Sequence, residues 1–426
     1  MDIKLIRKKD PKMAVLIETE RKRHEETLNL IASENYPSRT VREALSSMFV
    51  VKYSEGRPDK RYYGGTRVID KLETLVEGRV KKVFKINPKK WTVNVQPYSG
   101  SPANYAVLRG LLTPGDKIMS LALPHGGHLS QGAKVSLSGQ DFKIVNYFVN
   151  KKGFLDYKEI ERLAKKEKPK LIIAGFSAYP RKIDFKKFGQ IAHRIDAYFM
   201  ADIAHIAGLI IGGVHPSPFP FADVVTFTTH KTIRGPRGAV IICREKLRDK
   251  IFPKVFPGIQ GGPHNHTICA LGIALKEVQT VQFKRYTRQI VKNAKILSKE
   301  LIKYNFDLIS GGTDNHLILI DLTSKGVSGK EAQNLLEEVS IIVNRNSIPY
   351  DQRKPFDPSG IRIGTPAATT RGMKEKEMKK IAFWINEVIS KHQSNLRIKK
   401  AASKRRASLD EIRREVKKLC KKFPLS

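Results

Sequence analysis

Cysteine is scarce in this chain, and the few cysteines present exclude several classes of protein. The sequence holds 3 cysteines in 426 residues, namely Cys243, Cys269 and Cys420. They form no CxxC pair and have no spacing typical of a metal site. Because disulfide-stapled secreted domains need many closely spaced cysteines, we expect free thiols in a reducing compartment and no bound metal.

Long hydrophobic runs are also missing. Residues 1–7 lack the apolar core of a signal peptide, and no run reaches the roughly 20 apolar residues that cross a bilayer. The hydrophobic fraction is 40% and the charged fraction 28%, which is typical of a globular protein with a sizeable core. We therefore predict a cytoplasmic protein without a membrane partner.

Acidic residues are few relative to basic ones. Lys and Arg number 79 and Asp and Glu 41, so the formal net charge is +38. Such a charge favours anionic partners, including nucleic acids. Residues 391–426 hold 13 basic and 3 acidic residues, a net of +10, so most of the excess is spread over the chain. This basic segment has no interleaved aromatics, and we do not predict nucleic acid as the primary partner.

The order of apolar segments predicts the fold class. Short apolar, β-branched segments alternate with helical segments between residues 92 and 242. This alternation predicts βα units and a mostly parallel sheet with helices on both faces, an α/β fold. Strands expected at 315–321 and 361–363 flank a helix at 329–339, which predicts a small α+β domain.

The length of the chain indicates two domains and an arm. The amino-terminal arm has helical spacing over residues 13–30, and Ser38 is placed to cap a second helix. A long amphipathic helix is expected at 279–304. We divide the chain into a helical arm (1–50), a large domain (51–280), and an interdomain helix with a small carboxyl-terminal domain and basic tail (281–426).

One lysine follows a buried strand in a position that suits covalent chemistry. The apolar run at 222–227 leads to His230 and Lys231, and Gly235, Pro236 and Gly238 then forbid a continuing strand. A buried lysine loses its charge readily, and a neutral amine attacks carbonyls, so Lys231 is a candidate for Schiff-base formation. A solvated lysine in a loop is equally compatible with this stretch alone.

Two more strand ends carry suitable side chains. Asp202 ends one apolar run, and Ser177 follows another. The carboxyl ends of parallel strands meet at one edge of the sheet, so Ser177, Asp202 and Lys231 are expected to converge. A lysine for the aldehyde and an acid for the ring nitrogen are what pyridoxal phosphate requires from a protein.

Two turns are candidates for contacts with that cofactor. Ser99, Gly100 and Ser101 open a helix before Pro102, and a helix start with free amides binds phosphate. Ordinary helix capping would explain this motif equally simply. The glycines between His125 and His128 allow close approach of the backbone, so we expect His128 to stack on the ring and His125 to support the turn.

Substrate contacts are predicted from a loop and a strand. Residues 52–66 have no apolar core and form a large loop in which Tyr53, Glu55 and Tyr63 are candidates for acid–base work, or for a subunit contact. Arg362 lies between two isoleucines of a short strand, and an arginine there can clamp a carboxylate with two parallel bonds.

Several longer motifs resemble those of serine hydroxymethyltransferases. The resemblance runs from about residue 13 to the carboxyl end and is carried by six segments, at residues 30–35, 52–56, 61–65, 125–129, 310–316 and 359–366. It implies a pyridoxal-phosphate enzyme of fold type I, similar to aspartate aminotransferase. It also implies reversible conversion of serine and tetrahydrofolate to glycine and methylene-tetrahydrofolate, by a homodimer or tetramer with active sites shared between subunits.

The resemblance assigns roles to residues of this chain. Lys231 would bear the cofactor, Asp202 would pair with its nitrogen, and Glu55 would carry a proton between serine and folate. Arg237 would stabilise the cofactor or its turn. Further cofactor contacts would come from Tyr53, Ser99, Gly100, Ser101, His128, Ser177, His205, His230, Gly261 and Gly262, the last two reaching the neighbouring subunit. Substrate or folate contacts would come from Ser33, Tyr63, Leu123, Gly127, Leu129, Asn346, Phe356 and Arg362.

Some residues depart from the family pattern, and three competing functions stay open. Pro124, Gln131 and Lys354 differ from the residues common in bacterial relatives, which bears on folate affinity and not on cofactor chemistry. An aldolase that uses pyridoxal phosphate without folate would share the lysine and the aspartate. The second competing function is a basic nucleic-acid-binding protein on an inactive scaffold, and the third is a regulatory or structural oligomer.

Overall fold

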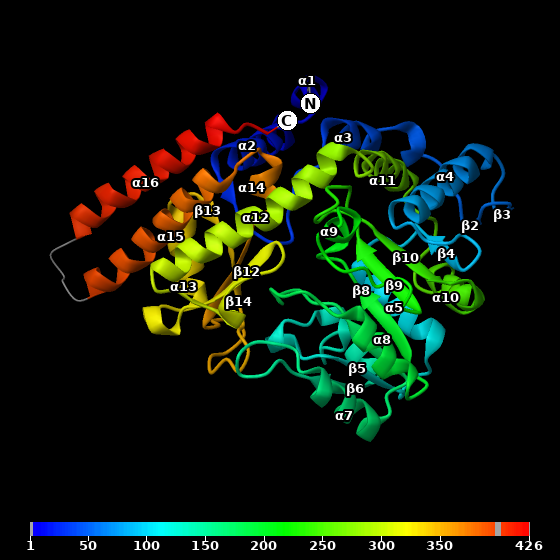
Figure 1. Cartoon of the computed structure of the whole chain (residues 1–426). Coiled ribbons are helices and arrows are strands. Elements are labelled where there is room, and N and C mark those ends of the chain that lie inside the picture. Colours follow the sequence, from blue (N-terminus) through cyan, green and yellow to red (C-terminus); the bar gives the residue numbers. More distant parts are fainter. Residues whose placement is uncertain (1–2, 397–401, 426) are drawn as a thin grey trace.

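The computed structural model describes residues 3–396 and 402–425, which fold around a seven-stranded sheet (Figure 1). The strand order is β4-β10-β9-β8-β7-β5-β6. Neighbouring strands are parallel, except that β10 is antiparallel to both β4 and β9. The predicted mostly parallel sheet is therefore confirmed. Its strands are β4 (Trp91–Asn94), β5 (Lys117–Leu121), β6 (Lys143–Tyr147), β7 (Leu171–Ala174), β8 (Tyr198–Asp202), β9 (Val224–Thr228) and β10 (Ala239–Arg244).

Helices cover both faces of this sheet. Successive side chains of a strand point to opposite faces. In β7, accordingly, Leu171 and Ile173 pack in one hydrophobic cluster, and Ile172 and Ala174 pack in another. The first cluster includes α5 (Gly100–Leu111) and α10 (Arg248–Val255). The second includes α3 (Arg39–Leu45), α4 (Arg67–Val83), α7 (Tyr157–Glu167), α8 (Phe185–His193), α9 (Ala207–Ile211) and α11 (Asn265–Glu277).

A smaller antiparallel sheet forms the carboxyl-terminal part, as expected. Its order is β11-β12-β15-β14. The long helix α12 (Val281–Lys303) joins the two parts (Figure 1), with Phe283 in the large core and Leu297 in the second one. The elements here are β11 (Asp307–Leu308), β12 (Leu317–Asp321), α13 (Gly329–Glu338), β14 (Asn344–Asn346), β15 (Gly360–Gly364), α14 (Pro366–Thr370), α15 (Glu375–Leu396) and α16 (Ala402–Lys422).

The helix predicted over residues 13–30 is too long. After α1 (Lys4–Lys9), helix α2 spans Pro11–Glu26. Leu28–Asn29 forms strand β1, which pairs in parallel with β13 (Ile341–Ile342). Leu28 and Leu30 are buried in the core of the smaller part. The second predicted helix is present as α3, and the Ser38 hydroxyl caps it by accepting from Val41 N at 3.2 Å.

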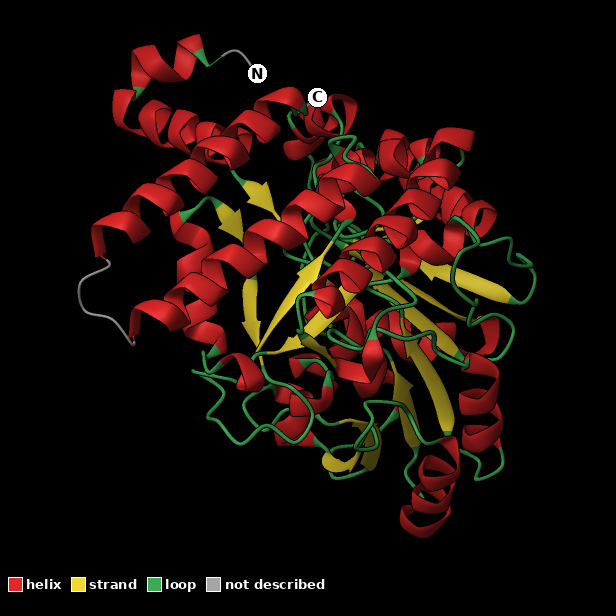
Figure 2. Cartoon of the chain, turned by 60° about the vertical axis from the view of Figure 1, so that its left-hand side comes forward, coloured by secondary structure: helices red, strands yellow, loops and turns green. Residues whose placement is uncertain are grey.

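Arg371 links helix α2, near the amino terminus, to helix α16, near the carboxyl terminus. Helices α2 and α16 lie side by side (Figure 2), and the buried guanidinium of Arg371 lies at their carboxyl-terminal ends. It donates hydrogen bonds to the main-chain oxygens of His24, Glu25, Thr27, Cys420 and Phe423. The negative ends of two helix dipoles thus share one cation.

The predicted loop at residues 52–66 contains a small hairpin, β2 (Gly56–Arg57) and β3 (Lys60–Arg61). It is anchored on α4 by ion pairs of Arg57 and Arg61 with the fully buried Glu73. A short helix, α6 (Leu137–Asp141), precedes β6. No helix within the described ranges combines the length and apolarity needed to cross a membrane.

Candidate active site

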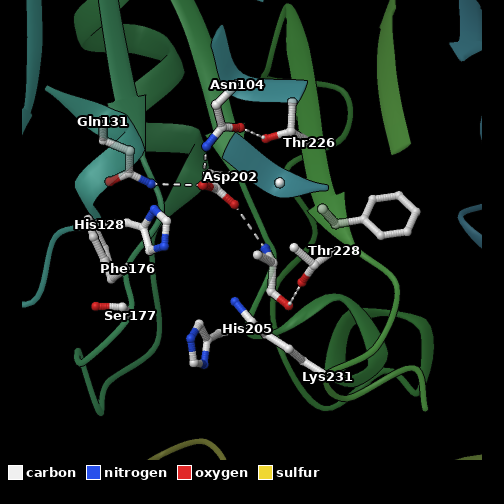
Figure 3. Close-up of a pocket in the computed structure, with 13 residues that line it drawn as sticks. Asn104, His128, Gln131, Phe176, Ser177, Asp202, His205, Thr226, Thr228 and Lys231 are labelled. Atoms are coloured by element: carbon white, nitrogen blue, oxygen red, sulfur yellow. Dashed lines mark hydrogen bonds between the residues drawn. The ribbon is translucent and has the colours of Figure 1, made fainter. Parts of the chain in front are cut away.

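Three strand ends of the large sheet meet at one pocket (Figure 3). Asp202 is the last residue of β8, Ser177 follows β7, and Lys231 follows β9. The convergence that parallel strands predict is therefore observed. Other residues lining the pocket are Gly100, Asn104, His128, Gln131, Phe176, Ala204, His205, Thr226, Phe227 and Thr228.

Lys231 is buried, so the interpretation as a solvated loop lysine is wrong. Its side chain is 8% exposed. Burial lowers the pKa of the amine to about 8, although the Asp202 carboxylate acts in the opposite direction. About a tenth of the amine is then neutral at pH 7. The Asn35 side-chain amide donates to the Lys231 carbonyl oxygen at 2.9 Å, which fixes the main chain at this point.

Two amides hold the Asp202 carboxylate (Figure 3). Asn104 Nδ2 and Gln131 Nε2 donate to Asp202 Oδ2 at 2.8 and 2.9 Å. The Ala204 main-chain N–H donates to Oδ1 at 3.1 Å. The Thr226 hydroxyl donates to Asn104 Oδ1 at 2.7 Å, so the Nδ2 end of the Asn104 amide faces Asp202. The orientation of the carboxylate is thereby fixed.

Two imidazoles beside the pocket are neutral at physiological pH. Burial lowers the pKa of His128 and lowers that of His205 well below its ordinary value. The Ser130 main-chain N–H donates to His128 Nδ1 at 3.2 Å, so the ring proton of His128 lies on Nε2. His205 Nδ1 lies 3.2 Å from Nε2 of the buried His316.

Arg362 is a buried cation that has no counter-ion among residues 3–396 and 402–425. It is 9% exposed, and burial lowers its pKa to about 10. Its guanidinium donates to the Ser177 carbonyl oxygen at 2.6 Å and to Asn344 Oδ1 at 3.1 Å. In the part of the chain that the structure describes, no carboxylate forms an ion pair with it. A buried charge in this state favours an anionic ligand.

The amino terminus of α5 reaches the same pocket through Gly100. Ser99 is the N-cap residue, but its side chain makes no capping hydrogen bond. A Cβ at Gly100 would lie 2.8 Å from Thr228 Cγ2, so only glycine allows this approach of helix and strand. Ser101 lines a neighbouring pocket together with Leu129. The amides at this helix start remain available for an anion.

A model of the serine hydroxymethyltransferase family matches residues 6–385 of the chain. A protein of that name from Desulfotalea psychrophila is 51% identical over 419 residues, covering 98% of this chain and 95% of the relative. Another from Acidothermus cellulolyticus is 49% identical over 417 residues, covering 97% and 95%. The chain belongs to the serine hydroxymethyltransferase family. Its two sheets agree with the predicted fold type I.

A second group of predicted site residues lies apart from the Lys231 pocket of this family member. Glu55, Tyr63 and Gly261 line a separate open pocket. The rings of Tyr53 and Tyr63 are 5.1 Å apart, and a Cβ at Gly262 would lie 3.2 Å from the Tyr53 ring. The two tyrosines are 55% and 44% exposed. Within one chain, the structure does not bring this group to Lys231.

The residues predicted to contact folate do not line the Lys231 pocket either. Leu123, Leu129 and Phe356 are exposed at 44%, 47% and 83%, and Asn346 is half-buried in β14. Gly127 is packed in the turn, where a Cβ would lie 2.1 Å from the Leu121 carbonyl oxygen.

His230 and Ser33 do not line the Lys231 pocket. His230 precedes Lys231 without lining the pocket, and burial lowers its pKa to about 3. Ser33 is half-buried and follows Ala32, which packs on Gly364, the last residue of the strand β15 that contains Arg362.

Sequence reasoning missed several residues that this family member gathers around Asp202 and Arg362. Asn104 has no role in any predicted motif, and Gln131 stands out only as a departure from relatives. Asn104 lies on the buried face of α5 among Ala103, Ala106 and Val107. A polar residue on such an apolar face is a signal that could have identified it. The others missed are Phe176, Thr226, Thr228, His316 and Asn344.

Proposed function

We propose that the chain catalyses the reversible conversion of serine and tetrahydrofolate to glycine and 5,10-methylenetetrahydrofolate, with pyridoxal 5'-phosphate as cofactor. The observation that carries the proposal is a buried lysine amine in one pocket with a carboxylate held by two amides. Family membership supports it, because relatives covering nearly the whole chain are named serine hydroxymethyltransferase.

The side chains around the pocket fit the proposed cofactor. Lys231 offers a partly neutral amine to an aldehyde, and Asp202 offers an oriented carboxylate to a protonated ring nitrogen. The phosphate would lie at the amino terminus of α5, with Ser99, Gly100 and Ser101. His128 would stack on the ring, and Ser177, His205 and His230 would support these contacts. When bound, pyridoxal phosphate supplies a ring that accepts the electron pair released at the substrate α-carbon.

Arg362 would bind the carboxylate of serine or glycine, with Ser33 nearby. Its guanidinium is buried and has no counter-ion among the described residues, so a substrate carboxylate would offset the cost of burying the charge. Two parallel hydrogen bonds would also orient the α-carbon. The two amide hydrogen bonds orient the Asp202 carboxylate, which would pair with the protonated ring nitrogen.

Glu55 would move the proton of the serine hydroxyl, and Tyr53 and Tyr63 would hydrogen-bond the substrate and cofactor. Because this group does not line the Lys231 pocket of its own chain, we propose that it completes the site of a second copy in a homodimer. Gly261 and Gly262, packed against Glu55 and Tyr53, would reach the cofactor phosphate there.

Tetrahydrofolate would be bound by residues that surround the substrate. We assign this role to Leu123, Gly127, Leu129, Asn346 and Phe356. Lys354 would attract the glutamate tail of folate, and a Lys354→Glu variant with unchanged folate affinity would contradict that role. Assembly beyond a dimer and a cytoplasmic location stay predictions.

The proposal is tested by serine cleavage with and without tetrahydrofolate. We expect cleavage to depend on folate, the purified protein to absorb visible light through its lysine-bound cofactor, and Lys231→Arg to lose both properties. Serine cleavage at an unchanged rate without folate would identify an aldolase instead. A colourless protein that does not bind pyridoxal phosphate would exclude both enzymes.

A further inference from the structure

A second pocket with a strong charge lies on α12, where this helix passes the turn between α14 and α15. It shares no residue with the Lys231 pocket. Its lining residues are Arg234, Gln282, Arg285, Tyr286, Arg288, Gln289, Lys292, Thr369, Gly372, Met373 and Lys374. Five of these are basic and none is acidic.

The described residues neutralise only part of the positive charge in this pocket. Lys292 forms an ion pair with Glu375. Within residues 3–396 and 402–425, no ion pair involves Arg234, Arg285 or Arg288. The guanidinium groups therefore repel one another across a shared space, and a bound anion would relieve that repulsion.

The arrangement along α12 is costly for the helix. Arg285, Arg288 and Lys292 follow one another at spacings of three and four residues, which places them on one face of α12. Like charges at this spacing destabilise a helix. Some other basic side chains on helices are paired at these spacings, as in Glu159–Arg162, Glu161–Lys165 and Glu300–Lys303.

Arg234 is held in a fixed orientation in the pocket. Its backbone is in the left-handed region, with φ of 62°. Its guanidinium lies 4.3 Å from the centroid of the Tyr286 ring, and the Tyr286 hydroxyl is fixed in turn by Asn35 at 2.7 Å. A stacked guanidinium keeps its N–H edge free for a planar, two-pronged contact with an oxyanion.

We propose that this pocket binds a compound with several phosphoryl groups, such as a nucleoside triphosphate or an inorganic polyphosphate. Three arginines provide the paired N–H donors that match phosphate oxygens. The four cations besides Lys292, which is paired with Glu375, suit the several negative charges of a triphosphate. A single carboxylate would leave most of this charge unpaired. The proposal does not rest on the proposed enzyme activity.

The test measures binding of inorganic triphosphate and of ATP by calorimetry, at fixed ionic strength. The full-length protein is first saturated with pyridoxal phosphate, so that the proposed phosphate site at Gly100 is filled. The pocket variant is R285Q/R288Q/K292Q, and all three side chains are exposed. The control variant is K151Q/K152Q/K158Q, which removes the same charge at exposed lysines outside the pocket.

We expect both ligands to bind the native protein and the pocket variant to bind them at least 10-fold more weakly, with the control unchanged. Equal affinity for the two ligands indicates that the phosphates alone are recognised, and tighter binding of ATP indicates a nucleotide site. The proposal is overturned if triphosphate does not bind, or if both variants lose affinity equally. Binding of a long RNA with no binding of triphosphate would also overturn it.

Discussion

The folded protein stabilises the neutral form of the Lys231 amine relative to that of an exposed lysine. Its pKa is lowered from 10.5 to about 8, mainly by burial. Between these two pH values the unfolded chain binds more protons than the folded chain, so the free energy of unfolding rises with pH there. Below pH 8 both states are protonated, and the folded state bears the full cost of the buried charge.

The variant Lys231→Met tests this cost in the protein without cofactor. The quantity compared is the free energy of unfolding of the variant minus that of the native protein. We expect this difference to be roughly 3 kcal/mol more positive at pH 7 than at pH 10.5. Urea unfolding at pH 7, 9 and 10.5 measures it. The exposed Lys151→Met is the control, and a Lys231→Met difference that is the same at all three pH values would contradict the burial of charge.

The sequence predicted Lys231, Asp202 and Ser177 because their positions follow from strand ends alone. Asn104 and Gln131 could not be predicted in this way. They contact Asp202 only because α5 and the turn after β5 pack against the end of β8. Such contacts depend on tertiary packing, and neither residue type has a spacing that identifies it as a partner of a distant carboxylate.

Among the elements of the fold, the hairpin β2–β3 controls the position of Glu55. The side chain of Arg61 is 3% exposed. Its Nη1 donates to the carbonyl oxygens of Ser54 and Gly56, at 2.9 and 2.8 Å, on either side of Glu55. Its Nη2 donates to the buried Glu73 at 2.7 Å. Arg61 thus ties the backbone around Glu55 to α4, and we infer that it is a positioning residue.

We expect Arg61→Lys to lower kcat for folate-dependent serine cleavage by about 10-fold, because one ammonium cannot hold both carbonyl oxygens and Glu73 together. The visible absorption of the bound cofactor should be retained, since Arg61 does not line the Lys231 pocket. Steady-state kinetics and an absorption spectrum on the same sample measure both. The exposed neighbour Lys60→Gln is the matched control, and equal losses in the two variants would exclude the positioning role.

Strand β1 shows where sequence reasoning fails for an element. The helical spacing of Met13, Leu16 and Ile17 was extended through Leu30, yet Leu28–Asn29 is a strand because its partner is Ile341–Ile342. Local periodicity cannot reveal a partner that is far away in the sequence. The central strands β7, β8 and β9 were predictable, because they are mostly apolar runs buried on both faces.

At the scale of the whole molecule, the proposed catalytic groups are divided between two places. Lys231, Asp202 and Arg362 belong to one group, and Glu55 and Tyr63 line a different pocket of the same chain. If each active site combines the first group of one subunit with the second group of its partner, a single chain contains two incomplete halves. Closed twofold dimers satisfy this requirement, because both sites are then completed by the same symmetry.

Mixed dimers test this division. One preparation carries Lys231→Ala and the other Glu55→Gln, and each alone is expected to be inactive. When equal amounts are unfolded and refolded together, half of the dimers are hybrids. Each hybrid holds one site with both native residues and one site with neither, so about a quarter of the native activity should return. If Glu55 acted on Lys231 of its own chain, no site in any hybrid would be complete and no activity would return. Refolding each variant separately and then mixing the dimers, without exchange of subunits, is the control that should stay inactive.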